Sequence, residues 1–170
     1  MANIGLFAET GIVSIPYNVG EWLSSYVQQG HKLLVGDTTG GDSKFHEAIS
    51  RIGGNDSTII YCMDSARNNA FGFKTKSFKT AFDEEQKAIT IYCEDNSIEP
   101  QTFGGVNKVE EIAQNSNWYQ FRDRQIVRDS DMIIIVTVSD MLPKRIQQIV
   151  QYANVTNTAV HIVSLTNTPQ

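Results

Sequence analysis

The chain has 170 residues, of which 41% are hydrophobic and 19% are charged, and its formal net charge is −5. A chain of this length buries most of the surface that it exposes when unfolded, so we expect a single domain over residues 1–170. The acidic balance disfavours sequence-independent binding to DNA or RNA, and we expect no nucleic-acid partner.

Apolar runs alternate with helical patterns along the chain. Six runs are expected to be strands: residues 3–8, 32–36, 57–63, 88–93, 131–138 and 159–165. They are apolar nearly throughout, which is typical of a parallel sheet covered on both faces. Helices are expected between them over residues 16–29, 42–52, 106–115, 119–129 and 143–153. This order predicts an α/β domain of three layers with a mostly parallel sheet of about six strands.

Two segments fall outside this alternation. Residues 64–87 are too polar for a core and too long for a minimal turn, which predicts a short helix, a lid or an insertion. Residues 166–170, TNTPQ, are expected to form a flexible tail.

The cysteines and the N-terminal residues bear on the compartment. Cys62 and Cys93 lie in apolar runs without CxxC spacing, which favours buried free thiols over a disulfide or a metal site. The start, MANIGLFAET, lacks the basic segment of a signal peptide, and no apolar run approaches the roughly 20 residues of a membrane span. We expect a cytoplasmic or phage-intracellular protein without membrane anchor, metal or cofactor.

A glycine-rich turn follows the second predicted strand, within LLVGDTTGGDSKFHEAI, residues 33–49. Gly36, Gly40 and Gly41 permit positive φ and leave backbone amides uncovered. Asp42 or Ser43 can cap the next helix, whose first N–H groups favour an anion. Two interpretations stay open at this point: a phosphate-binding turn, or a tight connection between strand and helix.

This stretch resembles the G-x-x-x-G-x-D turn of the SLOG superfamily, Rossmann-like nucleotide-binding proteins that include DprA/Smf and the LOG "lysine decarboxylase-like" phosphoribohydrolases. Residues 118–136, WYQFRDRQIVRDSDMIIIV, are similar to the Arg/Lys-Asp helix and following strand of that group, and the resemblance covers about residues 3–165. It implies a nucleotide site held by two sets of residues. They are Gly36, Asp37, Thr38, Gly40, Gly41 and Asp42 in the turn, and Arg122 and Asp123, with Arg128 as a further candidate, in the late helix.

The chain departs from the LOG pattern after the fifth predicted strand. LOG hydrolases carry a PGGxGTxxE segment there, whereas this chain has TVSDMLPKRIQQIV, residues 137–150. The glycines and the glutamate of that segment are missing, which argues against LOG hydrolase chemistry. Ser139 still lies at the end of a strand, where ligands of open α/β sheets bind, and is kept as a ligand contact.

Arg67 is the main candidate outside the turn. Its guanidinium can bind a phosphate bidentately, and Phe71 and Phe73 can offer a stacking face to a base. A surface loop that covers the edge of the core is the alternative. Trp118 and Tyr119 likewise either stack on a base or anchor the late helix.

Four carboxylates follow apolar runs and suggest an enzyme as the alternative function. Glu9, Asp64, Glu94 and Asp95 are expected at strand ends, where a carboxylate can attack or stabilise an N-glycosidic centre. A nucleotide phosphoribohydrolase or a reaction like that of the nucleoside deoxyribosyltransferases would fit. We assign no catalytic residue.

The expected function is binding of a nucleotide or of an ADP-ribose or cyclic-nucleotide type of signal, by a stand-alone SLOG-like sensor or sequestering protein. A homo-oligomer is also expected, as in many members of that superfamily. The last helix offers an apolar stripe, Ile146, Ile149, Val150 and Ala153, that faces either its own sheet or another subunit.

Overall fold

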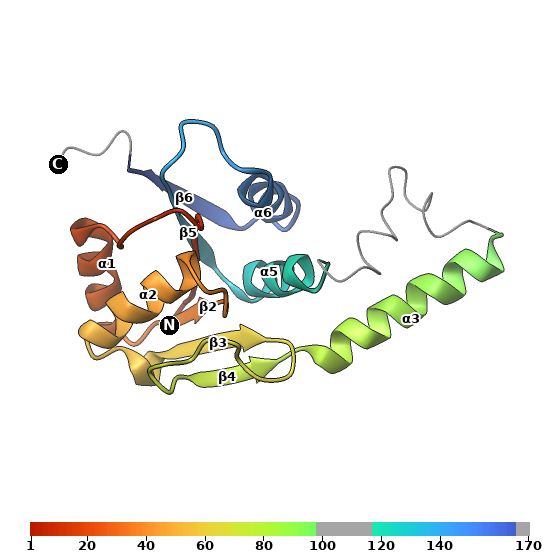
Figure 1. Cartoon of the computed structure of the whole chain (residues 1–170), viewed down its shortest axis with the longest axis horizontal. Helices are drawn as coiled ribbons and strands as arrows, with labels where there is room; N and C mark the ends of the chain where they lie inside the picture. Colours follow the sequence, from red (N-terminus) through yellow and green to blue (C-terminus); the bar gives the residue numbers. More distant parts are fainter. Residues whose placement is uncertain (98–116, 166–170) are drawn as a thin grey trace.

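The computed structural model describes residues 1–97 and 117–165. Its sheet contains β1 (Asn3–Ala8), β2 (Lys32–Val35), β3 (Thr58–Cys62), β4 (Lys74–Ser77), β5 (Met132–Thr137) and β6 (Ala159–Ser164). The strands lie in the order β4-β3-β2-β1-β5-β6, and every pairing is parallel (Figure 1). The predicted Rossmann-like α/β domain with a six-stranded sheet is therefore confirmed.

The described helices are α1 (Tyr17–Gln28), α2 (Gly41–Arg51), α3 (Lys79–Asp95), α5 (Asn117–Asp129) and α6 (Lys144–Val155), with a 3₁₀ turn at Asn55–Ser57. Pro16 and Pro143 directly precede α1 and α6, where a missing N–H costs nothing. The helix predicted over residues 106–115 and the tail 166–170 lie outside the described residues. Within the described part, no helix combines the length and the apolar character that crossing a bilayer requires.

The direction of strand addition reverses once. The chain lays down β1 to β4 toward one edge, then returns to place β5 on the other side of β1. The loops after β1 and β5 lead to α1 and α6, which lie on opposite faces of the sheet (Figure 1). The carboxyl ends of β1 and β5 thus form the switch point at which open α/β sheets bind ligands.

Two hydrophobic clusters fill the space between the sheet and its helices. On one face, Val19 and Leu23 of α1 and Phe45 and Ile49 of α2 are buried against the sheet. On the other, α5 and α6 contribute Phe121, Ile126, Ile146, Ile149 and Ala153. The apolar stripe of α6 therefore faces its own sheet, which resolves one alternative that the sequence left open.

One predicted strand is wrong. Residues 88–93 belong to the helix α3, because Phe82, Ile89 and Cys93 recur at helical spacing and Phe82 and Cys93 are buried. The sixth strand is instead β4, KTKS, whose four residues are all exposed, and it lies within the stretch 64–87, for which the sequence predicts no strand. That stretch holds β4 and the first half of α3; its action as a lid stays a prediction.

Candidate functional site

The carboxyl edge of the sheet collects the predicted site residues. The turn after β2 and the loop after β3 lie there because each follows a strand. The first turn of α5 lies there because α5 runs antiparallel to β5, which follows it. Side chains as far as 130 positions apart in sequence therefore meet at one edge.

A buried ion pair joins the turn to α5. Arg122 Nη1 lies 2.9 Å from Asp37 Oδ1, and both side chains are fully buried. Arg122 Nη2 lies 3.8 Å from Asp42 Oδ2 and 3.1 Å from Asp123 Oδ1. Burial alone lowers the pKa of Arg122, but Asp123, Asp42 and Asp37 outweigh burial and raise it, so the guanidinium is a permanent cation.

The glycines of the turn make room for the protein itself. A Cβ on Gly36 would lie 2.5 Å from Asp42 Oδ2 and 3.0 Å from Arg122, so only glycine lets the guanidinium approach. A Cβ on Gly41 would lie 2.2 Å from the carbonyl oxygen of Ala8 at the end of β1. Gly40 has φ of +118°, which disfavours any other residue. These contacts support the tight-connection interpretation, and a ligand contact at the turn stays a prediction.

Asp42 and Ser43 bind the backbone of the preceding turn, and the Ser43 bond to Gly40 is the one that position N3 of a helix makes to its N-cap in a capping box. Asp42 Oδ2 accepts the Thr38 N–H at 3.1 Å, and Ser43 Oγ accepts the Gly40 N–H at 3.1 Å. The N-cap residue Gly40 has no side chain, so among the described residues the N–H groups of the first turn of α2 have no side-chain acceptor. They keep the partial positive charge that attracts an anion.

Arg67 connects the loop after β3 to this cluster. Its backbone N–H donates to Asp37 Oδ2 at 3.0 Å, and Nε lies 3.4 Å from the same oxygen. Its guanidinium carbon lies 4.6 Å from the ring centre of Trp118 and 4.7 Å from that of Tyr119, and Nη1 donates to the Tyr119 hydroxyl. The side chain is still 40% exposed. Arg67 is thus held in place on one side and open to solvent on the other.

Asp123 extends the cluster to α6. Arg145 Nε lies 2.9 Å from Asp123 Oδ2, and Arg145 Nη2 lies 3.2 Å from Oδ1. Burial alone would raise the pKa of Asp123, but Arg145 and Arg122 hold it below the ordinary value. Three arginines and three aspartates thus form one charge-balanced group, which we call the ion network: Arg67, Arg122, Arg145, Asp37, Asp42 and Asp123.

Glu9 and Ser139 face each other across the switch point. Glu9 Oε2 accepts the backbone N–H of Val138 at 2.7 Å and of Ser139 at 3.2 Å, and Oε1 accepts the Ser139 hydroxyl at 2.5 Å. Burial opposes ionisation, but these hydrogen bonds outweigh it and lower the pKa of Glu9. Ser139 therefore lies at the predicted edge, where it binds Glu9.

Three buried polar atoms around the turn have no hydrogen-bond partner among the described residues: Thr38 Oγ1, Asp42 Oδ1 and His46 Nδ1. His46 Nε2 lies 2.9 Å from the Gly36 carbonyl oxygen, so the imidazole donates from Nε2 and carries its free lone pair on Nδ1. Buried polar atoms normally find a partner, and water or a ligand group can supply one here.

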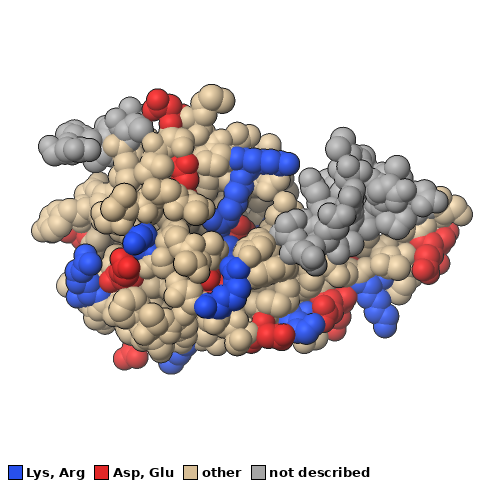
Figure 2. Space-filling view, in the orientation of Figure 1, with Lys and Arg blue, Asp and Glu red and all other residues tan. Residues whose placement is uncertain are grey.

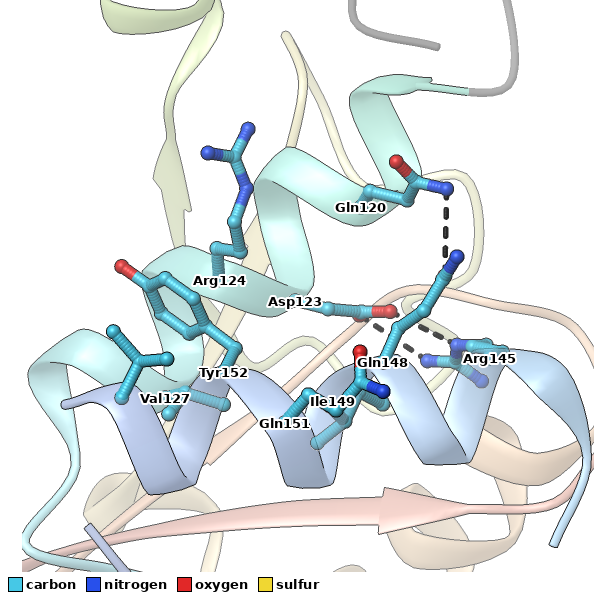
Figure 3. A pocket seen from close by; sticks show the side chains of 10 residues that line it. Gln120, Asp123, Arg124, Val127, Arg145, Gln148, Ile149, Gln151 and Tyr152 are labelled. Atoms are coloured by element: carbon cyan, nitrogen blue, oxygen red, sulfur yellow. Dashed lines mark hydrogen bonds and ion pairs between the residues drawn. The ribbon is translucent and has the colours of Figure 1, made fainter. Parts of the chain in front are cut away.

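A groove of about 320 Å³ lies between α5 and α6, next to the Asp123–Arg145 end of the ion network (Figure 3). The Asp123–Arg145 pair forms one wall, and Gln120 donates to Gln148 Oε1 across it at 3.4 Å. Of the predicted site residues, only Asp123 lines this groove. Its two arginines are paired, Arg124 with Glu85 and Arg145 with Asp123, so the groove offers no unpaired cation.

The carboxylates of the alternative function do not gather at the edge. Glu94 and Asp95 lie in the last turn of α3, which projects away from the sheet (Figure 1), so their predicted position at a strand end is wrong. Glu9 is at the edge but engaged with Ser139 and Val138. Asp64 follows β3 in an exposed loop. Among the described residues, no three His, Cys, Asp or Glu side chains are placed to hold a metal ion.

Sequence reasoning missed Arg145. It lies in the first turn of α6, directly after the loop at the switch point, and its position two residues after Pro143 was the available signal. The sequence likewise gives no sign that Trp118 and Tyr119 belong with Arg67, although their rings stack at 4.0 Å and hold its guanidinium. No family model, curated protein or solved structure matches the chain.

Proposed function

We propose that this protein binds a nucleotide or a nucleotide-derived signal, of ADP-ribose or cyclic-nucleotide type, at the carboxyl edge of the sheet, as a sensor or sequestering protein. The observation that carries the proposal is Arg67. Its guanidinium is fixed over two aromatic rings and beside Asp37, yet the side chain as a whole is 40% exposed. A guanidinium held in this way loses little side-chain entropy when it binds a phosphate.

The surroundings of Arg67 fit a ligand that is anionic at one end and aromatic at the other. The N–H groups of the first turn of α2 lie next to Asp37 and Asp42, and they add a second anion-binding element. The stacked Trp118 and Tyr119 rings supply a π surface that a base can share with Arg67. Gly40, Gly41, Thr38 and Ser139 border the same edge.

The charge pattern favours a small ligand over a nucleic acid. On the face shown in Figure 2, Lys and Arg side chains are interspersed with Asp and Glu, including along α3. Within the ion network every arginine is balanced by an aspartate. A polynucleotide needs a continuous basic surface to release its counterions, whereas a single phosphate group needs only one or two donors.

Cleavage of an N-glycosidic bond is the alternative, and the carboxylate at the switch point is not free to take part in it. Glu9 is the edge carboxylate nearest the switch point, and three hydrogen bonds already occupy it. A nucleophile or general base must reach the sugar with an unoccupied oxygen. We therefore favour binding without turnover.

Native mass spectrometry of the freshly purified protein is the first experiment, followed by denaturation and identification of any released molecule. Calorimetry then compares the wild type with Arg67→Ala and with the control Arg51→Ala, using ATP, ADP-ribose and cyclic nucleotides as probes. Arg51 is an exposed arginine at the C-terminal end of α2, near the amino ends of the strands and away from the carboxyl edge.

We expect binding of at least one probe, weakened about tenfold or more by Arg67→Ala and unchanged by Arg51→Ala. Absence of a co-purified nucleotide together with no heat for any probe would contradict the proposal. Release of free base or ribose phosphate on incubation would show that the alternative function is the right one.

A further inference from the structure

The edge strand β6 has unpaired main-chain groups. Among the described residues it pairs only with β5. The Leu165 N–H donates to the Thr137 carbonyl oxygen at 2.8 Å, and main-chain groups alternate in direction along a strand. His161 and Val163 therefore face β5, whereas the N–H and C=O groups of Val160 and Ile162 point away from the sheet.

The two edges of the sheet differ in how they are protected. β4, the other edge strand, has the sequence KTKS, with both lysines exposed. Lysines on an edge strand oppose pairing with another strand because two copies would bring like charges together. β6 has the sequence AVHIVS, without lysine, acidic residue or proline. Charge thus blocks association at the β4 edge and leaves it open at the β6 edge.

Apolar side chains flank the open edge. Ile162 on β6 is 41% exposed, and Val155, the last residue of α6, is 82% exposed. The inner stripe of α6 is already buried against its own sheet, so it is not available to a second subunit. The β6 edge is therefore the surface through which a homo-oligomer can bury exposed apolar groups and pair main-chain groups together.

We propose that β6 pairs antiparallel with β6 of a second copy of this chain, across a two-fold axis at His161. In this register the N–H and C=O groups of Val160 bind those of Ile162 in the partner, and the reverse pair forms by symmetry. The two His161 residues form the non-hydrogen-bonded pair between them. The two sheets then continue as one, and the carboxyl edge of each copy stays open. This dimer does not depend on ligand binding.

Sedimentation velocity over a range of concentrations tests the dimer. Val160→Pro removes an N–H that points away from β5, so it leaves the β5–β6 pairing intact and removes a hydrogen bond from each copy across the axis. Thr75→Pro is the matched control. The Phe78 N–H donates to the Cys62 carbonyl oxygen, so the Thr75 N–H points away from the sheet on the β4 edge.

We expect a dimer for the wild type and for Thr75→Pro, and dimerisation weakened about tenfold or more in Val160→Pro, with unchanged circular dichroism for all three. A wild-type protein that stays monomeric at high concentration would overturn the proposal. Equal weakening by the two proline variants would overturn it as well.

Crosslinking tests the register independently. Non-hydrogen-bonded antiparallel pairs place their Cα atoms close enough for a disulfide. His161→Cys is therefore expected to form a disulfide-linked dimer under mild oxidation. The native Cys62 and Cys93 are buried and free. Ile162→Cys is the control, because its partner in this register is Val160. A crosslink through residue 162 without one through residue 161 would overturn the proposed pairing.

Discussion

Arg122 is the buried cation that three aspartates share at the carboxyl edge. Removing an ion from water costs several kcal/mol, and its hydrogen bonds to Asp37 and Asp123 offset that cost. Without this side chain Asp42 keeps only the Thr38 N–H, and the carboxylates repel one another. Arg122 thus determines the stability of the site before it can influence any ligand.

Arg122→Met is expected to lower the free energy of unfolding by about 3–5 kcal/mol, because buried Asp42 loses its only cation and Asp37 and Asp123 each lose one of two. Urea denaturation followed by circular dichroism measures the change. Arg128→Met on the same helix is the control: that side chain is 60% exposed, and we expect a loss below about 1 kcal/mol. If Arg122→Met does not fold, Arg122→Lys is the variant to measure, because it keeps the charge without the planar guanidinium. Its loss in free energy of unfolding is expected to lie between those of Arg122→Met and Arg128→Met. Equal small losses would contradict the central role of Arg122.

His46 makes stability depend on pH. Burial lowers the pKa of its imidazole below the ordinary value, although the Gly36 carbonyl, Asp42 and Asp37 oppose the shift. The unfolded chain therefore takes up the proton first as the pH falls. Above about pH 6.5 the imidazole is neutral in both states and does not lower the free energy of unfolding. As the pH decreases below that value toward the folded-state pKa, the free energy of unfolding falls.

His46→Gln keeps a hydrogen-bond donor for the Gly36 carbonyl and removes the titration. We expect wild-type stability to fall by up to about 1.4 kcal/mol per pH unit below about pH 6.5, and the variant to fall less steeply. Urea denaturation at pH 7 and at about pH 5.5 compares them. Ile49→Val on the same helix is the control: its free energy of unfolding is expected to lie about 1 kcal/mol below that of the wild type at both pH values. Parallel pH dependence of wild type and His46→Gln would rule out this role.

At the scale of elements, the start of α2 is defined by its contact with the end of β1. Gly41→Ala is expected to destabilise the fold by about 1–3 kcal/mol, because the new Cβ would lie 2.2 Å from the Ala8 carbonyl oxygen. Gly20→Ala is the control inside α1, where nothing lies within 4 Å, and it is expected to stabilise by about 0.5–1 kcal/mol. Thermal unfolding of both variants measures the difference. A stabilising Gly41→Ala would show that α2 can shift away from β1 at little cost.

The sequence predicted those elements whose apolar composition indicates that they are buried. β1 and β5 are apolar nearly throughout because both faces of the sheet are covered, and this pattern located them correctly. β4 has no such signal, since all four of its residues are exposed. The segment 88–93 satisfied both the strand and the helix pattern, and only the buried positions Phe82 and Cys93 decide for the helix.

The candidate site was predictable in its parts and not in its contacts. The glycines and the Arg122–Asp123 pair are visible in the sequence, and the structure places them together. Their partners are set by tertiary geometry, as in the pairing of Asp37 with Arg122 across 85 positions. Spacing within a helix or a turn carries no information on such a pair. For the same reason the sequence cannot tell whether Gly36 makes room for a ligand, as the family resemblance implies, or for the Arg122 and Asp42 side chains that lie next to it.

For the whole molecule, burial decreases from the centre of the sheet toward the β4 edge. Ile4, Leu6 and Phe7 of β1 are at most 1% exposed, whereas β4 is exposed along its whole length. Free energies of local opening follow the number of buried apolar contacts around an amide. Amides of β1 and β5 are therefore expected to exchange with solvent only through global unfolding.

Native-state hydrogen exchange at increasing urea concentration measures this gradient. The amides of β1 should show the free energy of global unfolding and its full urea dependence, because opening β1 removes both core clusters at once. Amides of β4 that bind β3 should exchange through local openings, with a free energy several kcal/mol lower and little urea dependence. Lys76 is a suitable probe of this edge, because its backbone N–H points toward β3. If its amide shared the free energy and urea slope of β1, the sheet would unfold as one cooperative unit from edge to edge, and the exposed lysines of β4 would carry no cost in local stability.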